Sequence, residues 1–62
     1  MQISGEIMAV VASRAEQVLA GGAPVFVEPD EATRQRVAMF LGRITDGMVH
    51  DLENGVLILV RH

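Results

Sequence analysis

The stretch DLENGVLILVRH, Asp51–His62, decides the predicted fold. Its Asn54-Gly55 pair is a strong β-hairpin signal, because a two-residue type I′ turn requires positive φ at both central positions. The pair separates an alternating segment over residues 48–53 from a strand over residues 56–61. This closing strand is apolar on both faces, as strands with a neighbour on each side tend to be. We therefore expect VLILV at the centre of a sheet.

A two-residue turn also predicts which side chains face each other across the hairpin. Leu52 would lie opposite Leu57, and both Leu57 and Leu59 would point toward helices on one side of the sheet. The other side would carry four apolar residues: Val49, Val56, Ile58 and Val60. Nothing else in the predicted fold covers them, and an exposed apolar patch of this kind usually marks a contact site.

A helix and a short strand are predicted at the start of the chain. Over residues 4–19 apolar side chains recur with the i, i+3, i+4, i+7 spacing of an amphipathic helix. Ser4 would be its N-cap, and Gly21-Gly22 would end it. The following PVFVE, Pro24–Glu28, predicts a strand that lies antiparallel to the closing strand.

A second helix is predicted to follow Asp30, which is a suitable N-cap residue. Its buried stripe would consist of Val37, Phe40, Leu41 and Ile44. Gln35, Met39 and Gly42 lie nearly opposite this stripe on a helical wheel. Gly42 either caps the helix after Leu41, or lies within it and lets another backbone approach closely. We favour the cap or last-turn interpretation.

Together these elements predict one small α+β domain over residues 1–62, a two-layer α/β sandwich in the order α-β-α-β-β. Its three-stranded sheet would have VLILV central and two helices on one face. A chain of 62 residues, 50% of them hydrophobic, has little interior in which to bury so much apolar surface. It has no cysteine, so disulfides cannot supplement the core. We expect a homodimer or higher homo-oligomer, formed through the open sheet face.

The charge balance argues against nucleic-acid binding. Eight acidic residues accompany five arginines scattered along the chain, with no lysine, whereas nucleic-acid binders present a basic face. The longest apolar runs, IMAVVA and VLILV, are far shorter than the ~20 residues of a membrane span. No signal-peptide pattern is evident. We expect a cytoplasmic protein without a membrane span.

No constellation of residues predicts catalysis, a cofactor or a metal site. His50 in a strand and His62 at the C-terminus have no recognised ligand spacing. The acidic residues Glu28, Asp30 and Glu31 are explained by their position at a helix start, where the helix dipole favours negative charge. We therefore expect a non-enzymatic protein without cofactors.

A further set of positions matches the pattern of a known family: Pro24, Val25, Val27, Arg36, Val37, Phe40, Leu41, Gly42, Gly55 and Leu57. They form a Pro-Val-rich strand after a glycine turn, a helix of the R-V-x-x-F-L type and an apolar hairpin. In this order of elements, residues 19–62 resemble the core domain of the SepF cell-division proteins. The resemblance implies a dimerising, non-enzymatic adaptor that binds the tubulin-like division protein and assembles further.

The sequence thus predicts a small homo-oligomeric protein–protein interaction module, with a SepF-like adaptor in cell division as its specific form. The residues expected at its interfaces are Val49, Val56, Ile58, Val60, Met39 and Gly42. A protein partner other than a second copy is compatible with the same interpretation. The alternative is a small regulatory or ligand-binding subunit whose pocket forms between copies.

Overall fold

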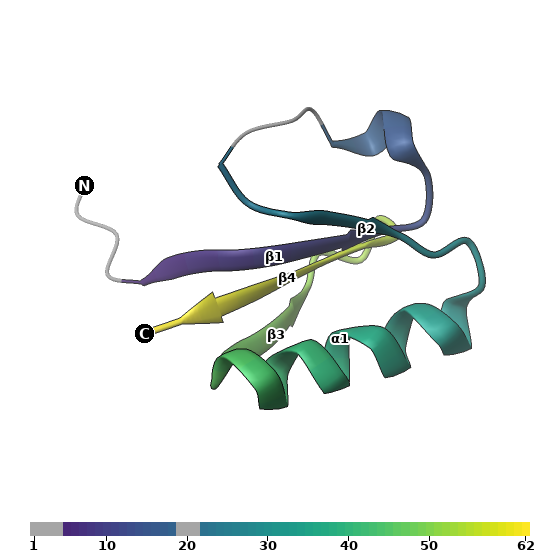
Figure 1. Ribbon diagram of the computed structural model, residues 1–62. Coiled ribbons are helices and arrows are strands. Elements are labelled where there is room, and N and C mark those ends of the chain that lie inside the picture. The colour runs from purple at the N-terminus through teal and green to yellow at the C-terminus, as the bar shows by residue number, and fades with distance from the viewer. Residues whose placement is uncertain (1–4, 19–21) are drawn as a thin grey trace.

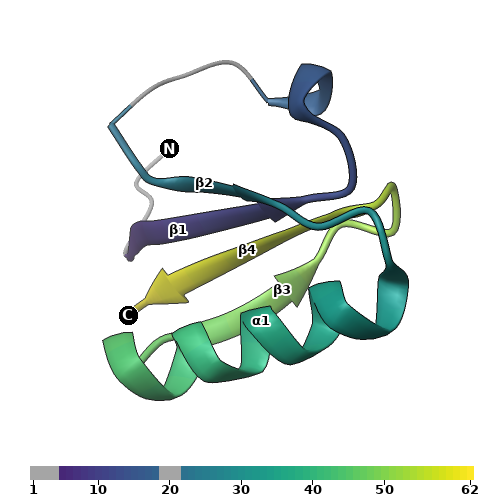
Figure 2. The same ribbon diagram turned by 45° about the vertical axis from the view of Figure 1, so that its right-hand side comes forward.

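The computed structural model describes residues 5–18 and 22–62. Their elements are, in chain order, β1 (Glu6–Ala12), the 3-10 turn η1 (Ala15–Gln17), β2 (Val25–Val27), α1 (Glu31–Thr45), β3 (Met48–Asp51) and β4 (Val56–Arg61). The strands form one sheet in the order β2-β1-β4-β3. Figure 1 shows α1 on one side of this sheet and η1 on the other. Figure 2 shows β3, next to α1, at one edge of the sheet and β2 at the opposite edge.

The helix predicted over residues 4–19 is wrong, because Glu6–Ala12 forms β1. A short apolar run that is buried on both faces fits a helix and an inner strand equally well. Here the consecutive β-branched residues Val10 and Val11 favour the strand. The expected Ser4 cap and the residues Leu19 and Gly21 at the expected helix end lie outside the described residues.

The order α-β-α-β-β, the three-stranded sheet and the pair of helices on one face are therefore also wrong. β1 pairs antiparallel with β4 and parallel with β2, so the described sheet has four strands and is mixed. The strand predicted at Val25–Val27 exists, but its neighbour is β1 instead of the closing strand. With β1 on one side of β4 and β3 on the other, the closing strand has no free edge left, and β2 pairs with the outer side of β1.

The β3–β4 hairpin has a three-residue loop, one residue longer than predicted. The N–H of Leu52 donates to the carbonyl oxygen of Val56 at 3.0 Å, which leaves residues 53–55 as the loop. Positive φ occurs at Glu53 (62°) and Gly55 (89°). The loop is held by side chains, since the Asp51 carboxylate accepts from the N–H of Glu53 at 2.7 Å.

The longer loop shifts the register of β3 by one residue. Val49 lies opposite Leu59 and His50 opposite Ile58. Because side chains alternate between the two faces of a strand, a shift of one residue moves each β3 side chain to the other face. Val49 therefore lies on the α1 side of the sheet, where the sequence did not place it, and His50 lies on the side away from α1.

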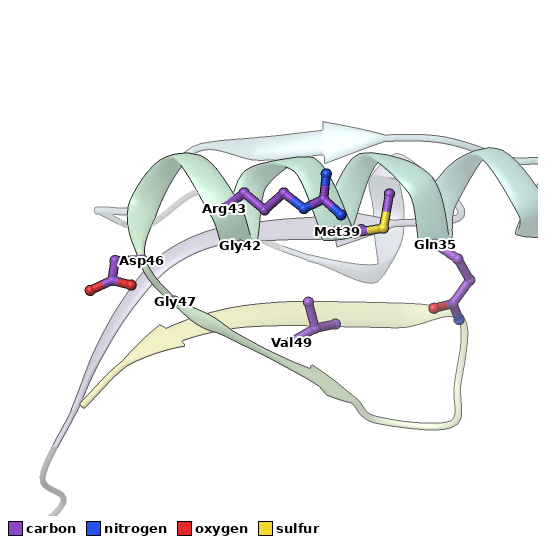
Figure 3. A pocket seen from close by; sticks show the side chains of 7 residues that line it. All are labelled: Gln35, Met39, Gly42, Arg43, Asp46, Gly47 and Val49. Carbon is purple, nitrogen blue, oxygen red and sulfur yellow. The ribbon is translucent and has the colours of Figure 1, made fainter.

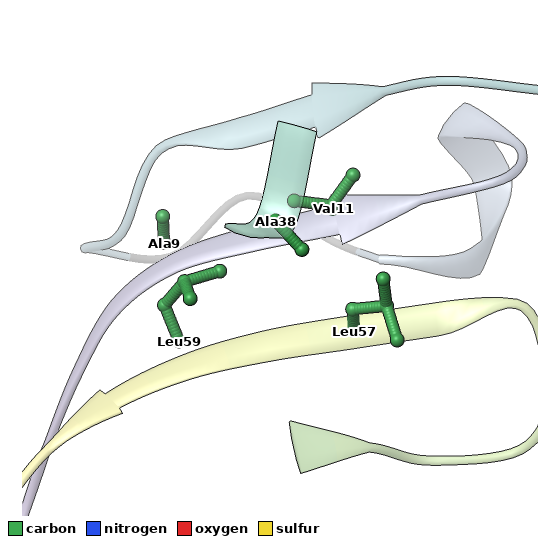
Figure 4. Close-up of a cluster of buried hydrophobic side chains, with 5 residues drawn as sticks. All are labelled: Ala9, Val11, Ala38, Leu57 and Leu59. Carbon is green, nitrogen blue, oxygen red and sulfur yellow. The ribbon is translucent and has the colours of Figure 1, made fainter. Parts of the chain in front are cut away.

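The main core lies between α1 and the sheet, and Figure 4 shows its fully buried members Ala9, Val11, Ala38, Leu57 and Leu59. Leu57 and Leu59 project toward α1 from the inner strand β4. The helix approaches the sheet through Ala38, whose small side chain permits close packing. Val37 and Leu41 pack against this cluster as predicted. The rest of the predicted stripe is wrong, because Phe40 and Ile44 are exposed.

A second cluster lies on the sheet face away from α1, which we call the outer face. It consists of Val10, Ala12 and Val56, with Val18 and Ile58 packed against it. Val18 belongs to the segment that follows β1, and this segment therefore covers one end of the outer face. The expectation that nothing in the chain covers this side is wrong for Val56, which is buried.

The predicted N-cap of α1 is confirmed. The Asp30 carboxylate accepts from the backbone N–H of Thr33 at 2.8 Å and from its hydroxyl at 2.9 Å. These two hydrogen bonds, the backbone one first, lower the pKa of Asp30 below its ordinary value, and Arg34 and Arg36 contribute in the same direction. The helix begins at Glu31 as a result.

Because the pKa of Asp30 is lowered by folding, the ionised cap stabilises the protein at pH values above the unfolded pKa, about 4. This stabilisation is lost as the pH falls through the lowered pKa. We expect Asp30→Ala to have a lower urea midpoint than the wild type at pH 7, with the difference shrinking below about pH 4. Asp30→Asn keeps a capping oxygen without the charge, so its stability should depend less on pH between 2 and 5. Equal pH dependence of wild type and Asp30→Asn would contradict this assignment.

Candidate protein-interaction surface

A groove of about 450 Å³ lies between α1 and β3. Its walls are Gln35, Met39, Gly42, Arg43 and Asp46 from α1 and its C-cap, together with Gly47 and Val49. Figure 3 shows Val49 pointing from β3 toward α1, and Gln35 pointing from α1 toward the far end of β3. Met39 and Val49 are 42% and 40% exposed. Two large apolar side chains thus line one solvent-accessible groove.

Gly42 lets the start of β3 come close to α1. A Cβ atom at Gly42 would lie 3.2 Å from the carbonyl oxygen of Gly47 and 3.7 Å from Val49. The helix extends to Thr45 and has Asp46 as its C-cap, so Gly42 lies in the last turn and is not the cap. Its carbonyl oxygen accepts from the N–H of Gly47 at 2.9 Å. Gly42 therefore lies within the helix, where the absence of a side chain lets the backbone of Gly47 approach closely.

The charged residues of the groove are not neutralised by neighbours. Within residues 5–18 and 22–62, the side chains of Arg43 and Asp46 make no hydrogen bond or ion pair. Arg43 extends along α1 toward Met39 (Figure 3). Its guanidinium group remains available for a carboxylate or a backbone carbonyl of a bound molecule.

A second hollow, of about 280 Å³, continues the groove toward the β3–β4 loop. Gln35 belongs to both hollows, and the second is otherwise lined by Glu31, Arg34, Asp51, Glu53, Gly55 and Leu57. The Arg34 guanidinium donates to the backbone carbonyl oxygens of Glu28 and Pro29 at 3.1 and 3.0 Å. Three carboxylates therefore share this hollow with one guanidinium that already has partners. We call the two hollows together the α1–β3 trough, with an apolar compartment and an acidic compartment.

The structure divides the six predicted interface residues between two surfaces. Val49, Met39 and Gly42 line the apolar compartment. Val56, Ile58 and Val60 belong to the outer face, where Val56 is buried and the other two are half-buried. The same face carries further exposed apolar side chains at Ile7, Val25, Val27 and Met48. Whether either surface is an interface stays a prediction.

Sequence reasoning placed Gln35 on the same side of α1 as Met39 and Gly42 but missed the charged residues of the trough. Asp46 follows these three with helical spacing on that side of α1, so the helical wheel alone could have added it. Asp51 and Glu53 gave no such signal. Their position beside α1 depends on the register of β3, which the predicted two-residue turn placed incorrectly.

The two histidines meet edge to face, with the ring centroids of His50 and His62 5.8 Å apart. In the part of the chain that the structure describes, no three His, Asp or Glu side chains gather into a group that could hold a metal ion. No helix among the described residues is long and apolar enough to cross a membrane. The expected absence of a cofactor stays a prediction.

A search of the curated proteins and a search of the solved structures found no match. A family model does match residues 4–62, and it is described as the capping complex subunit for YIEGIA. The resemblance to the SepF proteins is therefore wrong, and with it the expected role in cell division. The matched positions were mostly apolar ones that many small α+β domains share. The chain belongs to the family of capping complex subunits for YIEGIA.

Proposed function

We propose that this chain is a non-catalytic subunit that acts by binding a partner protein through the α1–β3 trough, and that YIEGIA is this partner. The family description supports the general role, since a subunit of a complex has protein partners. The observation that carries the choice of surface is the apolar compartment, where Met39 and Val49 remain exposed around the glycine at position 42. Concave, partly apolar surfaces with a few polar groups are typical binding sites.

The energetics favour an occupied trough. Completing the burial of Met39 and Val49 would contribute on the order of 1 kcal/mol for each side chain. Arg43 and Asp46 line the same groove and have no ion pair among the described residues, so they can add charge-assisted hydrogen bonds to a partner. The unbound chain gains neither contribution.

We also propose that the chain self-associates through the outer face. Ile7 and Met48 are exposed there beside the half-buried Ile58 and Val60. A twofold axis through this face would cover the apolar patch of each copy with that of the other. Light scattering at ~100 μM measures the mass directly, and a monomeric wild type would contradict self-association while leaving the proposal for the trough unaffected.

The cytoplasmic location stays a prediction.

Met39→Glu is expected to abolish binding to YIEGIA. A glutamate at this position would bring a carboxylate into the apolar part of the interface and would pair with Arg43, four residues along α1, which removes that guanidinium from the partner. Burying these charged groups costs several kcal/mol, which corresponds to an affinity loss of at least about 100-fold. Binding would be measured by co-purification and by titration of the purified chain. Circular dichroism would show that the variant keeps its fold, as expected for a side chain that is partly exposed.

Ile44→Glu is the matched control, because it introduces the same charge on the same helix. Ile44 is 78% exposed and does not line the trough. It should bind YIEGIA with wild-type affinity. If Ile44→Glu lost binding while Met39→Glu kept it, the partner would dock on the opposite side of α1 and the proposed surface would be wrong.

A further inference from the structure

β3 has a free edge beside the trough. It is the outermost strand next to α1 among the described residues. The N–H of Leu52 donates to Val56 of β4, and alternate residues of an antiparallel strand turn their backbone groups the same way. The N–H and C=O groups of Val49 and Asp51 therefore point away from β4, toward solvent. This edge can accept another strand.

A strand added to this edge would have its side chains in register with the trough. Val49 and Asp51 both point to the α1 side, opposite Leu59 and Leu57 of β4. Residues of the added strand that lie opposite them would point to the same side. One such side chain would enter the apolar compartment beside Met39. The next one on that side, two positions along, would lie over the acidic compartment.

The negative charge of the acidic compartment favours a basic residue at the position of the added strand that lies over it. Glu31, Asp51 and Glu53 line it without an ion pair among the described residues. A Lys or Arg of the partner would supply the missing positive charge. A second copy of this chain does not meet the requirement through β3, because the residues two positions from Val49 are Gly47 and Asp51, and neither is basic.

We infer that the partner protein docks as an extended strand on the free edge of β3, with an apolar side chain in the apolar compartment and a Lys or Arg two positions away over Glu31, Asp51 and Glu53. This inference rests on the proposed function, since it names what enters the same trough. Backbone hydrogen bonds to Val49 and Asp51 supply affinity in this mode, and the two side chains supply specificity.

Amide hydrogen exchange tests the strand addition. The full chain is compared free and in complex with YIEGIA, and the amides of Val49 and Asp51 should exchange at least about tenfold more slowly in the complex. If a complex sensitive to Met39→Glu forms but these two amides exchange as in the free chain, the partner docks by side-chain contact alone. Strand addition would then be wrong and the proposed function would stand. Absence of any complex with YIEGIA would overturn both.

Charge reversal tests the basic side chain. Glu53→Lys should weaken binding by about tenfold at low salt, with the difference shrinking at high salt. Glu16→Lys is the matched control, because it changes the net charge equally at an exposed position on η1, outside the trough. Its affinity should equal that of the wild type. Equal weakening by both variants, or by neither, would overturn the assignment of a Lys or Arg to the acidic compartment.

Discussion

Leu59→Ala is expected to lower the free energy of unfolding by about 3–5 kcal/mol. Leu59 is fully buried on the inner strand β4 and packs with Ala38 of α1 in the main core. Its removal would leave a cavity that the neighbouring strand β1 and the helix cannot fill by small movements. A domain of this size is stabilised by roughly 3–9 kcal/mol in total. The variant should therefore lose at least about a third of this stability, and a wild type at the lower end of the range would leave it largely unfolded.

Urea denaturation followed by circular dichroism measures this loss. Leu52→Ala is the control, because it removes the same side chain from the end of the hairpin, where Leu52 is 50% exposed. It should cost less than about 1 kcal/mol, since little apolar surface leaves the core. Equal destabilisation by the two variants would mean that the core is not centred between α1 and β4.

Gly55→Ala is expected to lower the free energy of unfolding by about 2–5 kcal/mol, through two separate effects. Gly55 has a φ of 89°, where a side chain costs about 1–2 kcal/mol. Its added Cβ would also lie 2.6 Å from the Ser13 hydroxyl oxygen, which is closer than real contacts allow. Relieving this overlap would cost about 1–3 kcal/mol more. Thermal denaturation measures the sum.

Gly22→Ala separates the two effects. Gly22 also has positive φ, at 59°, but a Cβ there would meet nothing within 4 Å. Gly22→Ala should therefore show only the backbone cost, about 1–2 kcal/mol. Equal losses of stability in the two alanine variants would mean that overlap with Ser13 adds nothing to the cost of Gly55→Ala.

The Gly55 contact joins the hairpin loop to the end of β1, and it therefore bears on the proposed binding surface. The N–H of Ser13 donates to the Gly55 carbonyl oxygen at 2.9 Å, and the Gln17 amide donates to the Asn54 carbonyl oxygen at 2.8 Å. This loop carries Glu53 beside the acidic compartment. Distortion at Gly55 should therefore also weaken partner binding, although Gly55 lies far from Met39 in the sequence.

Local signals were sufficient where one neighbouring residue or one turn determines the conformation. Asp30 determines where α1 begins, through hydrogen bonds to a residue three positions away. The strands at Val25–Val27 and Val56–Arg61 follow from their apolar, β-branched composition. Met39 and Gly42 were found because helical periodicity places them on one side of α1. Each of these features is decided within a few residues of the chain.

The candidate trough could not be found in this way, because it depends on β3 and α1 together. The Asn54-Gly55 pair indicated a hairpin, but the side chain of Asn54 accepts the N–H of Val56 at 3.1 Å, and Gln17 binds the loop from outside. These contacts accompany a three-residue loop. The resulting shift places Val49 in the groove that Met39 also lines, and Asp51 in the hollow that Glu31 also lines.

Capping, turn chemistry and alternation act over a few residues, so they were enough to predict the helix after Asp30, the hairpin and the two leucines of β4 that face the helix. That Glu6–Ala12 is a strand and that Val49 faces α1 depends on contacts between distant parts of the chain. The apolar run IMAVVA forms a strand because it pairs with β4. The register of the hairpin depends on the contacts that its loop makes. Both choices depend on residues more than 35 positions away in the chain, as in the pairing of Val11 with Leu57 and of Gln17 with Asn54.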